Sequence, residues 1–159
     1  MAKLTEGKPA PDFCLPQSGG GEVRLSDFKG KKSVVVYFYP KDDTPGCTLE
    51  ACDFRDDFKK IEKAGAVLFG VSADSLAAHE KFRGKYKLPF GLLSDETREV
   101  IKKYGVWKEK SLYGKKYMGI ERTTVVIDKA GRIAKVFAKV KVQGHSGEVL
   151  KTLKGEPGA

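Results

Sequence analysis

Two cysteines, Cys47 and Cys52, stand near the beginning of a predicted helix, where a thiol is placed to do chemistry. The segment Thr44-Pro45-Gly46-Cys47 has the residue order of a helix start. Thr44 suits the N-cap, and Pro45 suits the first helical position, where a missing N–H costs nothing. Cys47 then falls in the first turn, where free backbone N–H groups and the helix dipole favour an anion. A thiolate is such an anion, so the sequence predicts a reactive nucleophile at Cys47.

A simpler alternative is that Cys47 is a small buried residue at a helix start. The preceding segment, PKDDTPG (residues 40–46), is polar and rich in turn residues. A polar turn favours a reactive cysteine over a core residue. Thr44 adds a hydroxyl whose oxygen could accept a bond from the turn and whose proton could be donated to a bound ligand.

The spacing of Cys47 and Cys52 determines what this thiol can become. On an ideal helix, residues five apart are turned by about 140° and raised by about 7.5 Å, which separates their Cα atoms by roughly 8.6 Å. A disulfide requires Cα atoms about 4.4–6.8 Å apart. The two cysteines can therefore bond only if the first turn of the helix unwinds.

We expect no metal site. The two cysteines lack the C-x2-C spacing of a metal knuckle, and only His79 and His145 could add further soft ligands. We expect both histidines to be exposed or to cap helices rather than to act in catalysis. A C-x-x-C oxidoreductase is excluded, because that spacing does not occur in the chain.

Apolar runs and amphipathic segments predict the elements that position the cysteines. Residues 34–39 (VVVYFY) and 66–71 (AVLFGV) are typical of strands buried on both faces of a sheet. Further short strands are expected at 23–25 and 92–93, and a hairpin at 123–137; residues 107–119 are expected to form a loop or an irregular strand. Helices are expected at 49–64, 75–86, 95–104, where Asp95 would be the cap, and 147–153.

This order of elements indicates an α/β protein with a mixed central sheet flanked by helices, compatible with a thioredoxin-like fold. The first crossover implies parallel pairing, and the hairpin implies antiparallel edges. With 159 residues and no internal linker or repeat, the chain is expected to form one domain, residues 1–159.

Composition excludes several classes of protein. Three cysteines do not fit a secreted disulfide framework, and the start MAKLTEGKPAPDF lacks an apolar signal core, so we expect an intracellular, cytoplasmic protein. No segment is apolar enough for a membrane span. The net charge of +9 is spread along the chain, and no basic helix is interleaved with aromatics. We therefore expect neither membrane nor nucleic-acid binding.

The residues around Cys47 resemble a known family. The motif P-x-x-x-T-x-x-C is formed by Pro40, Thr44 and Cys47 and is followed by TLEACDFRD. It is similar to the active-site motif of peroxiredoxins of the bacterioferritin-comigratory-protein (peroxiredoxin Q) type. The resemblance extends over most of the chain through the segments PDF, SDFKGKK, FGVSADS, YGVW and GIERTTVVID. It implies a thioredoxin-like fold and reduction of hydrogen peroxide and organic hydroperoxides without a bound cofactor.

The resemblance also implies roles for individual residues. Cys47 matches the peroxidatic cysteine, which becomes a sulfenic acid, and Cys52 matches a resolving cysteine in the same chain. Thr44 matches the residue that hydrogen-bonds thiolate and peroxide, and Pro40 matches the residue that shields the pocket. Arg122 matches the arginine that stabilises the thiolate and polarises the O–O bond; the alternative is a surface arginine.

Two further residues have less definite roles. Glu50 fits a carboxylate that orients Arg122, and its alternative is a solvated acid in the first helical turn. Cys14 departs from the family, which more often has a hydroxyl residue there. We expect it to be small and half-buried, although an alternative or intermolecular disulfide is conceivable.

The leading interpretation is a thiol peroxidase that is recycled by thioredoxin or another dithiol. A resolving cysteine in the same chain removes the need for a dimer, so a monomer is expected. The alternative is a redox-sensing or chaperone-like protein that uses the Cys47 and Cys52 pair as a switch. Arg122 and Thr44 distinguish the two, because a switch has no need to polarise an O–O bond.

The cysteine spacing generates a first prediction. After treatment with peroxide, mass spectrometry of the digested protein should show a disulfide between Cys47 and Cys52, because the sulfenic acid at Cys47 condenses with the nearer thiol. A bridge from Cys47 to Cys14 instead would contradict the assignment of Cys52.

Overall fold

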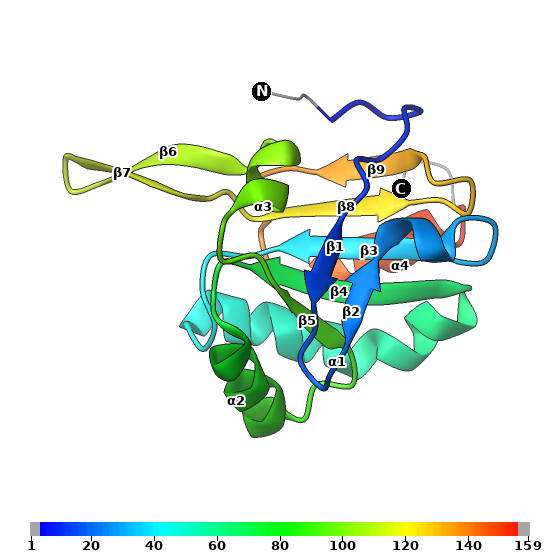
Figure 1. Ribbon diagram of the computed structural model, residues 1–159, viewed down its shortest axis with the longest axis horizontal. Coiled ribbons are helices and arrows are strands. Elements are labelled where there is room, and N and C mark those ends of the chain that lie inside the picture. Colours follow the sequence, from blue (N-terminus) through cyan, green and yellow to red (C-terminus); the bar gives the residue numbers. More distant parts are fainter. Residues whose placement is uncertain (1–3, 156–159) are drawn as a thin grey trace.

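The computed structural model, which describes residues 4–155, is built around a five-stranded mixed sheet in the order β5-β4-β3-β8-β9 (Figure 1). Strands β3, β4 and β5 are parallel to one another, whereas β8 is antiparallel to both β3 and β9. The sheet is therefore mixed, as predicted, and belongs to an α/β fold. The strands are β3 (Ser33–Phe38), β4 (Ala66–Ser72), β5 (Gly91–Ser94), β8 (Thr123–Ile127) and β9 (Ile133–Phe137).

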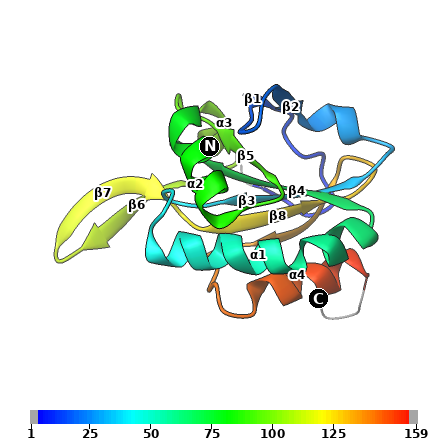
Figure 2. The same cartoon turned by 90° about the horizontal axis from the view of Figure 1, so that it is seen from below.

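Helices cover both faces of this sheet. Figure 2 shows α1 and α4 on one side, and α3 with the β1–β2 ribbon on the other. The helices are α1 (Pro45–Lys63), α2 (Leu76–Tyr86), α3 (Glu99–Lys103) and α4 (His145–Leu153), and a short 3-10 turn spans Leu25–Phe28. No helix within residues 4–155 is long and apolar enough to cross a membrane.

Strand β3 lies at the centre of two apolar cores. Alternate side chains of a strand point to opposite faces. Val34, Val36 and Phe38 accordingly join the core under α3 and β1–β2, whereas Val35 and Tyr37 join the core under α1, α2 and α4. This arrangement confirms that the apolar run at 34–39 is a strand buried on both faces.

Helices α1 to α4 all begin at residues other than those predicted, and the starts of α1 and α3 differ most. α1 begins at Pro45, so its start includes Cys47, as the capping argument indicated. α3 is much shorter than predicted, because the chain first turns through Arg98, whose φ of 65° is left-handed and precedes the helix. The Asp95 carboxylate nevertheless caps this helix by accepting a bond of 2.8 Å from the Ile101 N–H.

Residues 107–119 form no loop. They belong to a β-hairpin, β6 (Trp107–Leu112) paired antiparallel with β7 (Lys115–Ile120), which extends away from the central sheet (Figure 1). Its strands are mostly exposed on both faces, so they show no apolar alternation that could reveal them in the sequence. A second small ribbon pairs β1 (Cys14–Pro16) with β2 (Glu22–Arg24) across the glycine-rich turn.

Two other expectations need correction. Only one sheet edge, β9, is antiparallel; the other edge, β5, pairs in parallel with β4, and β8 lies inside the sheet. The histidines are not exposed: His79 is 0% and His145 is 2% accessible. Each is buried because both ring nitrogens find polar partners within the fold.

The close approach of β3 and β4 generates a second prediction. Gly70 is the register partner of Tyr37, and a Cβ added at Gly70 would lie 2.8 Å from Cζ of the Tyr37 ring. That ring cannot easily move, because it stacks on Phe54 with centroids 4.8 Å apart. Gly70→Ala should therefore lower the free energy of unfolding by about 1–3 kcal/mol, measured by urea denaturation.

Gly84 provides the matched control. It lies in α2 with nothing within 4 Å of an added Cβ. Gly84→Ala should raise stability by up to about 1 kcal/mol, since alanine is the better helix former. Equal effects of the two substitutions would contradict the packing argument.

Candidate active site

The site forms where β3 ends and α1 begins. After β3 the chain turns through residues 40–44 and enters α1, of which Cys47 is the third residue. Cys47 is only 1% accessible. Pro40, at the start of the turn, is half-buried. The local sequence thus places the thiol inside the first helical turn, as predicted.

Thr44 occupies the N-cap position with an extended backbone, φ −92° and ψ 156°, as predicted. Its side chain, however, makes no capping bond within the described part of the chain. Instead, the Thr44 hydroxyl donates to the carbonyl of Lys41 at 3.0 Å. Thr44 is therefore at the expected N-cap position, but its side-chain oxygen does not accept the expected capping bond from an N–H of α1, and the hydroxyl is directed toward Lys41 instead.

Arg122 reaches the thiol from a distant part of the chain. Its Nη2 donates to Cys47 Sγ at 3.3 Å, and its Nη1 donates to Glu50 Oε1 at 2.6 Å. The sheet explains this approach, because Phe38 pairs with Thr123 at the end of β3 from which the turn to Cys47 departs. The alternative of a surface arginine is excluded, since the side chain is only 17% accessible.

Glu50 lies one helical turn after Cys47 and is 1% accessible, so the alternative of a solvated acid is excluded as well. Burial raises the pKa of Glu50 to about 7, although the Arg122 guanidinium opposes this increase. One carboxylate oxygen, Oε2, has no hydrogen-bond partner among residues 4–155. Glu50 thus meets Arg122 as an acid that can be neutral or charged near neutral pH.

The charges of this group are coupled. Burial by itself lowers the pKa of Arg122, but the neighbouring Glu50 and Cys47 raise it overall. The guanidinium therefore stays charged and offers a fixed cation beside the sulfur. A cation that donates to Sγ favours a thiolate and can also stabilise negative charge that develops on a substrate oxygen.

Cys52 lies in the same unbroken helix as Cys47. It is half-buried, and both thiols are free. This agrees with the expectation that an intact helix holds the two sulfurs apart. Cys14 is also free and half-buried, as expected; it lies on β1, where its thiol contacts Glu22 at 3.5 Å.

Sequence reasoning missed Lys110. This half-buried residue of β6 lies close enough to Arg122 and Cys47 to interact with their charges. Burial, reinforced by Arg122, lowers the pKa of Lys110, and Cys47 opposes this decrease. The sequence offered no signal for it, because the hairpin that carries it was expected to be a loop or an irregular strand and no contact of its side chains could be inferred.

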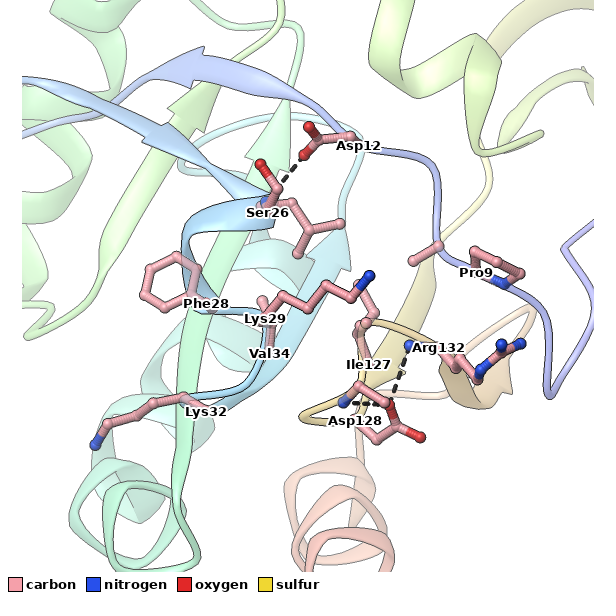
Figure 3. A pocket seen from close by; sticks show the side chains of 14 residues that line it. Pro9, Asp12, Ser26, Phe28, Lys29, Lys32, Val34, Ile127, Asp128 and Arg132 are labelled. Carbon is pink, nitrogen blue, oxygen red and sulfur yellow. Dashed lines mark hydrogen bonds between the residues drawn. The ribbon is translucent and has the colours of Figure 1, made fainter.

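A pocket of about 220 Å³ lies elsewhere on the molecule (Figure 3). Its wall includes Phe28, Lys29 and Val34, together with Ile127 and Arg132. Val34 lies at the opposite end of β3 from the turn that leads to Cys47. None of the predicted site residues lines this pocket, so it is separate from the cysteine chemistry.

Comparisons with known proteins agree with this geometry. The sequence profile of the AhpC/TSA family matches residues 7–136. The chain is 53% identical to peroxiredoxin Bcp of Bacillus subtilis, covering 93% of this chain and 94% of that protein. It is 46% identical to peroxiredoxin Bcp of Escherichia coli, covering 97% of this chain and 98% of that protein.

Solved structures give the same result. The fold is similar to PrxQ from Xylella fastidiosa, with a TM-score of 0.91, 36% identity and 98% of each chain covered. It is also similar to the bacterioferritin comigratory protein of Xanthomonas campestris, studied for its alkyl peroxide reduction activity. There the TM-score is 0.88 and the identity 39%, covering 95% of this chain and 98% of that one. These neighbours confirm the thioredoxin-like fold.

The buried carboxyl generates a third prediction. In the unfolded chain, Glu50 should lose its proton near its ordinary pKa of 4.5. In the folded protein, it keeps the proton up to its raised pKa of about 7. Between these values the folded state binds more protons, so stability falls as pH rises. At about 1.4 kcal/mol per pH unit, the loss across this window approaches about 3 kcal/mol.

Glu50→Gln should remove this dependence, because glutamine does not titrate. Urea unfolding of the parent and the variant at several pH values from 4 to 8 measures the difference between their free energies of unfolding. Curves that run parallel over the whole range would show that Glu50 does not titrate as described.

Proposed function

Since the chain belongs to the AhpC/TSA family and is a peroxiredoxin of the Bcp type, a thiol peroxidase, we propose that Cys47 is its peroxidatic cysteine. The substrates are hydrogen peroxide and organic hydroperoxides. One observation carries this proposal: the Arg122 guanidinium donates to Cys47 Sγ and to the buried Glu50 at the same time. A switch that only forms a disulfide has no need of a cation placed to polarise an O–O bond beside the reacting sulfur.

In the first step, the Cys47 thiolate attacks one oxygen of the peroxide. An S–O bond forms as the O–O bond breaks, and the leaving oxygen takes a proton to become water or an alcohol. Negative charge develops on that oxygen in the transition state, where the Arg122 guanidinium and the free N–H groups of the first turn of α1 can stabilise it. Glu50 orients Arg122 through the contact of 2.6 Å.

Thr44 and Pro40 shape the pocket in this proposal. The Thr44 hydroxyl donates a hydrogen bond to Lys41 O, so its oxygen is left to accept a hydrogen bond from a peroxide. A hydroxyl that turned away from Lys41 could instead donate to the thiolate. Pro40, half-buried at the start of the same turn, shields the reacting sulfur from bulk water.

In the second step, Cys52 attacks the sulfur of the Cys47 sulfenic acid, and water leaves as the disulfide forms. The two thiols lie in one continuous helix, α1, so its first turns must unwind before this step. A dithiol reductant then restores both thiols by exchange. Thioredoxin is the reductant that we propose.

The same chemistry suggests where and how the protein works. A cycle that ends with free thiols requires a reducing compartment, and we propose the cytoplasm. Because the resolving thiol lies in the same chain, a monomer can complete the cycle. We therefore propose a monomeric enzyme.

The assignment of the two cysteines generates a fourth prediction. Cys52→Ser should still consume about one equivalent of hydrogen peroxide per protein, because Cys47 forms a sulfenic acid, but turnover with thioredoxin should stop. Stopped-flow measurement of peroxide consumption, with trapping of the sulfenic acid by dimedone, tests this result.

Cys47→Ser is the matched control and should show neither the burst nor turnover. Peroxide turnover by Cys47→Ser in the presence of thioredoxin would contradict the mechanism. Full turnover by Cys52→Ser would show that another thiol resolves the sulfenic acid.

A further inference from the structure

A buried polar network ties the turn before Cys47 to helix α2. The network joins Asp42 of the turn to His79 of α2, whose ring is fully buried. Neither residue belongs to the proposed chemistry. Asp42 lies between the end of β3 and the start of α1, where the position of the reactive cysteine is determined, and His79 holds it from α2.

His79 is bonded at both ring nitrogens. Nε2 lies 3.0 Å from the Leu93 carbonyl oxygen, and Nδ1 lies 2.7 Å from Asp42 Oδ2. A carbonyl can only accept, so Nε2 carries a hydrogen. The short distance between Nδ1 and the Asp42 carboxylate, inside the fold, makes this contact a tight link between α2 and the turn.

Asp42 is held from two further directions. The Tyr39 hydroxyl donates to Oδ1 at 2.5 Å, and the backbone N–H of Asp42 donates to Asp74 Oδ2 at 2.9 Å. Asp74 Oδ2 also accepts a bond of 2.6 Å from the Ser72 hydroxyl. Although Asp42, Asp74 and His79 are ligand types with atoms within 4.8 Å of one another, these contacts already satisfy them, so the cluster does not require a metal ion.

A second contact with α2 holds the next residue of the turn. Asp43 has a left-handed φ of 59°, a conformation that aspartate adopts more readily than most residues with a side chain. Its carboxylate accepts from Lys85 Nζ at 2.8 Å and from the Tyr86 hydroxyl at 3.0 Å. These contacts of Asp43 are exposed to solvent, so they stabilise the turn much less than the buried contact between His79 and Asp42 does.

The held turn connects directly to the cysteine. Lys41 accepts the Thr44 hydroxyl proton, and the Thr44 carbonyl accepts the first intrahelical bond, 2.8 Å from the Thr48 N–H. Cys47 lies in the chain between Thr44, the N-cap, and Thr48 of α1. Whatever fixes residues 41–44 therefore also fixes the direction from which a peroxide meets the sulfur.

We propose that His79 and Asp42 are positioning residues of the peroxidase reaction: they hold residues 41–44 in place, so that Cys47 faces the peroxide and the first turn of α1 stays wound. This inference rests on the proposed function. The network stabilises the wound state, which reacts with peroxide, against the unwound state, which forms the disulfide. The two chemical steps should therefore respond to its loss in opposite directions.

The test uses Asp42→Ala/His79→Leu, which removes the whole pair and leaves no unpaired buried charge. In a Cys52→Ser background, the rate constant of Cys47 with hydrogen peroxide should fall by about 10- to 100-fold, because the nucleophile is no longer held in line. With Cys52 present, the rate of disulfide formation after the sulfenic acid should rise several-fold, and less Cys47 should be overoxidised at high peroxide. His79→Gln, whose amide can keep one of the two bonds, should lie between the double variant and the parent.

His145→Leu is the matched control. His145 is also buried, at the start of α4, and also has two polar partners, Thr124 and Glu148, but it does not contact the turn. Its replacement should lower the melting temperature without changing the ratio of the two rates. The rates of all variants are measured at a temperature below the unfolding transition of each.

Two outcomes would overturn the positioning role while leaving the peroxidase intact. One is that the double variant keeps both rates of the parent. The other is that both rates fall together, as in a protein that is merely less stable, and that His145→Leu does the same. If the Cys52→Ser parent itself forms no sulfenic acid, both the proposed function and this inference are wrong.

Discussion

The active site depends on one contact made across the fold: the guanidinium of Arg122 lies between the sulfur of Cys47 and the carboxyl of Glu50. A half-buried guanidinium that donates to two groups at once has strong directional bonds and little freedom to move. Glu50 and Cys47 occupy one face of α1, whereas Arg122 precedes β8. The contact therefore exists only because β8 lies beside β3, with Phe38 paired to Thr123.

The proposed chemistry also requires that the contacts of Cys47 in this arrangement break before the disulfide forms. Cys47 and Cys52 lie in one continuous helix whose geometry prevents their bonding. In the proposed mechanism, the contacts that make Cys47 reactive, namely those with Arg122 and the N–H groups of the first turn, belong to the wound state. Their loss is required for the second step. Stability at this site is therefore a compromise between reaction with peroxide and access for Cys52.

The sequence predicted the buried elements well and the exposed ones poorly. The central strands and α1 appeared clearly, because burial on both faces and one-sided amphipathicity leave periodic apolar patterns. The hairpin β6–β7 was missed because its side chains are mostly exposed and follow no such period. The histidines were misjudged because a polar residue can be buried whenever the fold supplies partners, and Asp42 and Leu93 are far from His79 in sequence.

By itself, the sequence predicted a nucleophile at Cys47, its place in the first turn of a helix, and the need for this helix to unwind before Cys47 and Cys52 can bond. These properties are local, because capping preferences and helix geometry act over a few residues. Only the tertiary structure decided which groups surround the sulfur. Burial of Glu50, the approach of Arg122 and Lys110, and the attachment of residues 41–44 to α2 all depend on strand order and helix packing. Contacts between residues far apart in the chain are set by the fold as a whole, and no local pattern records them.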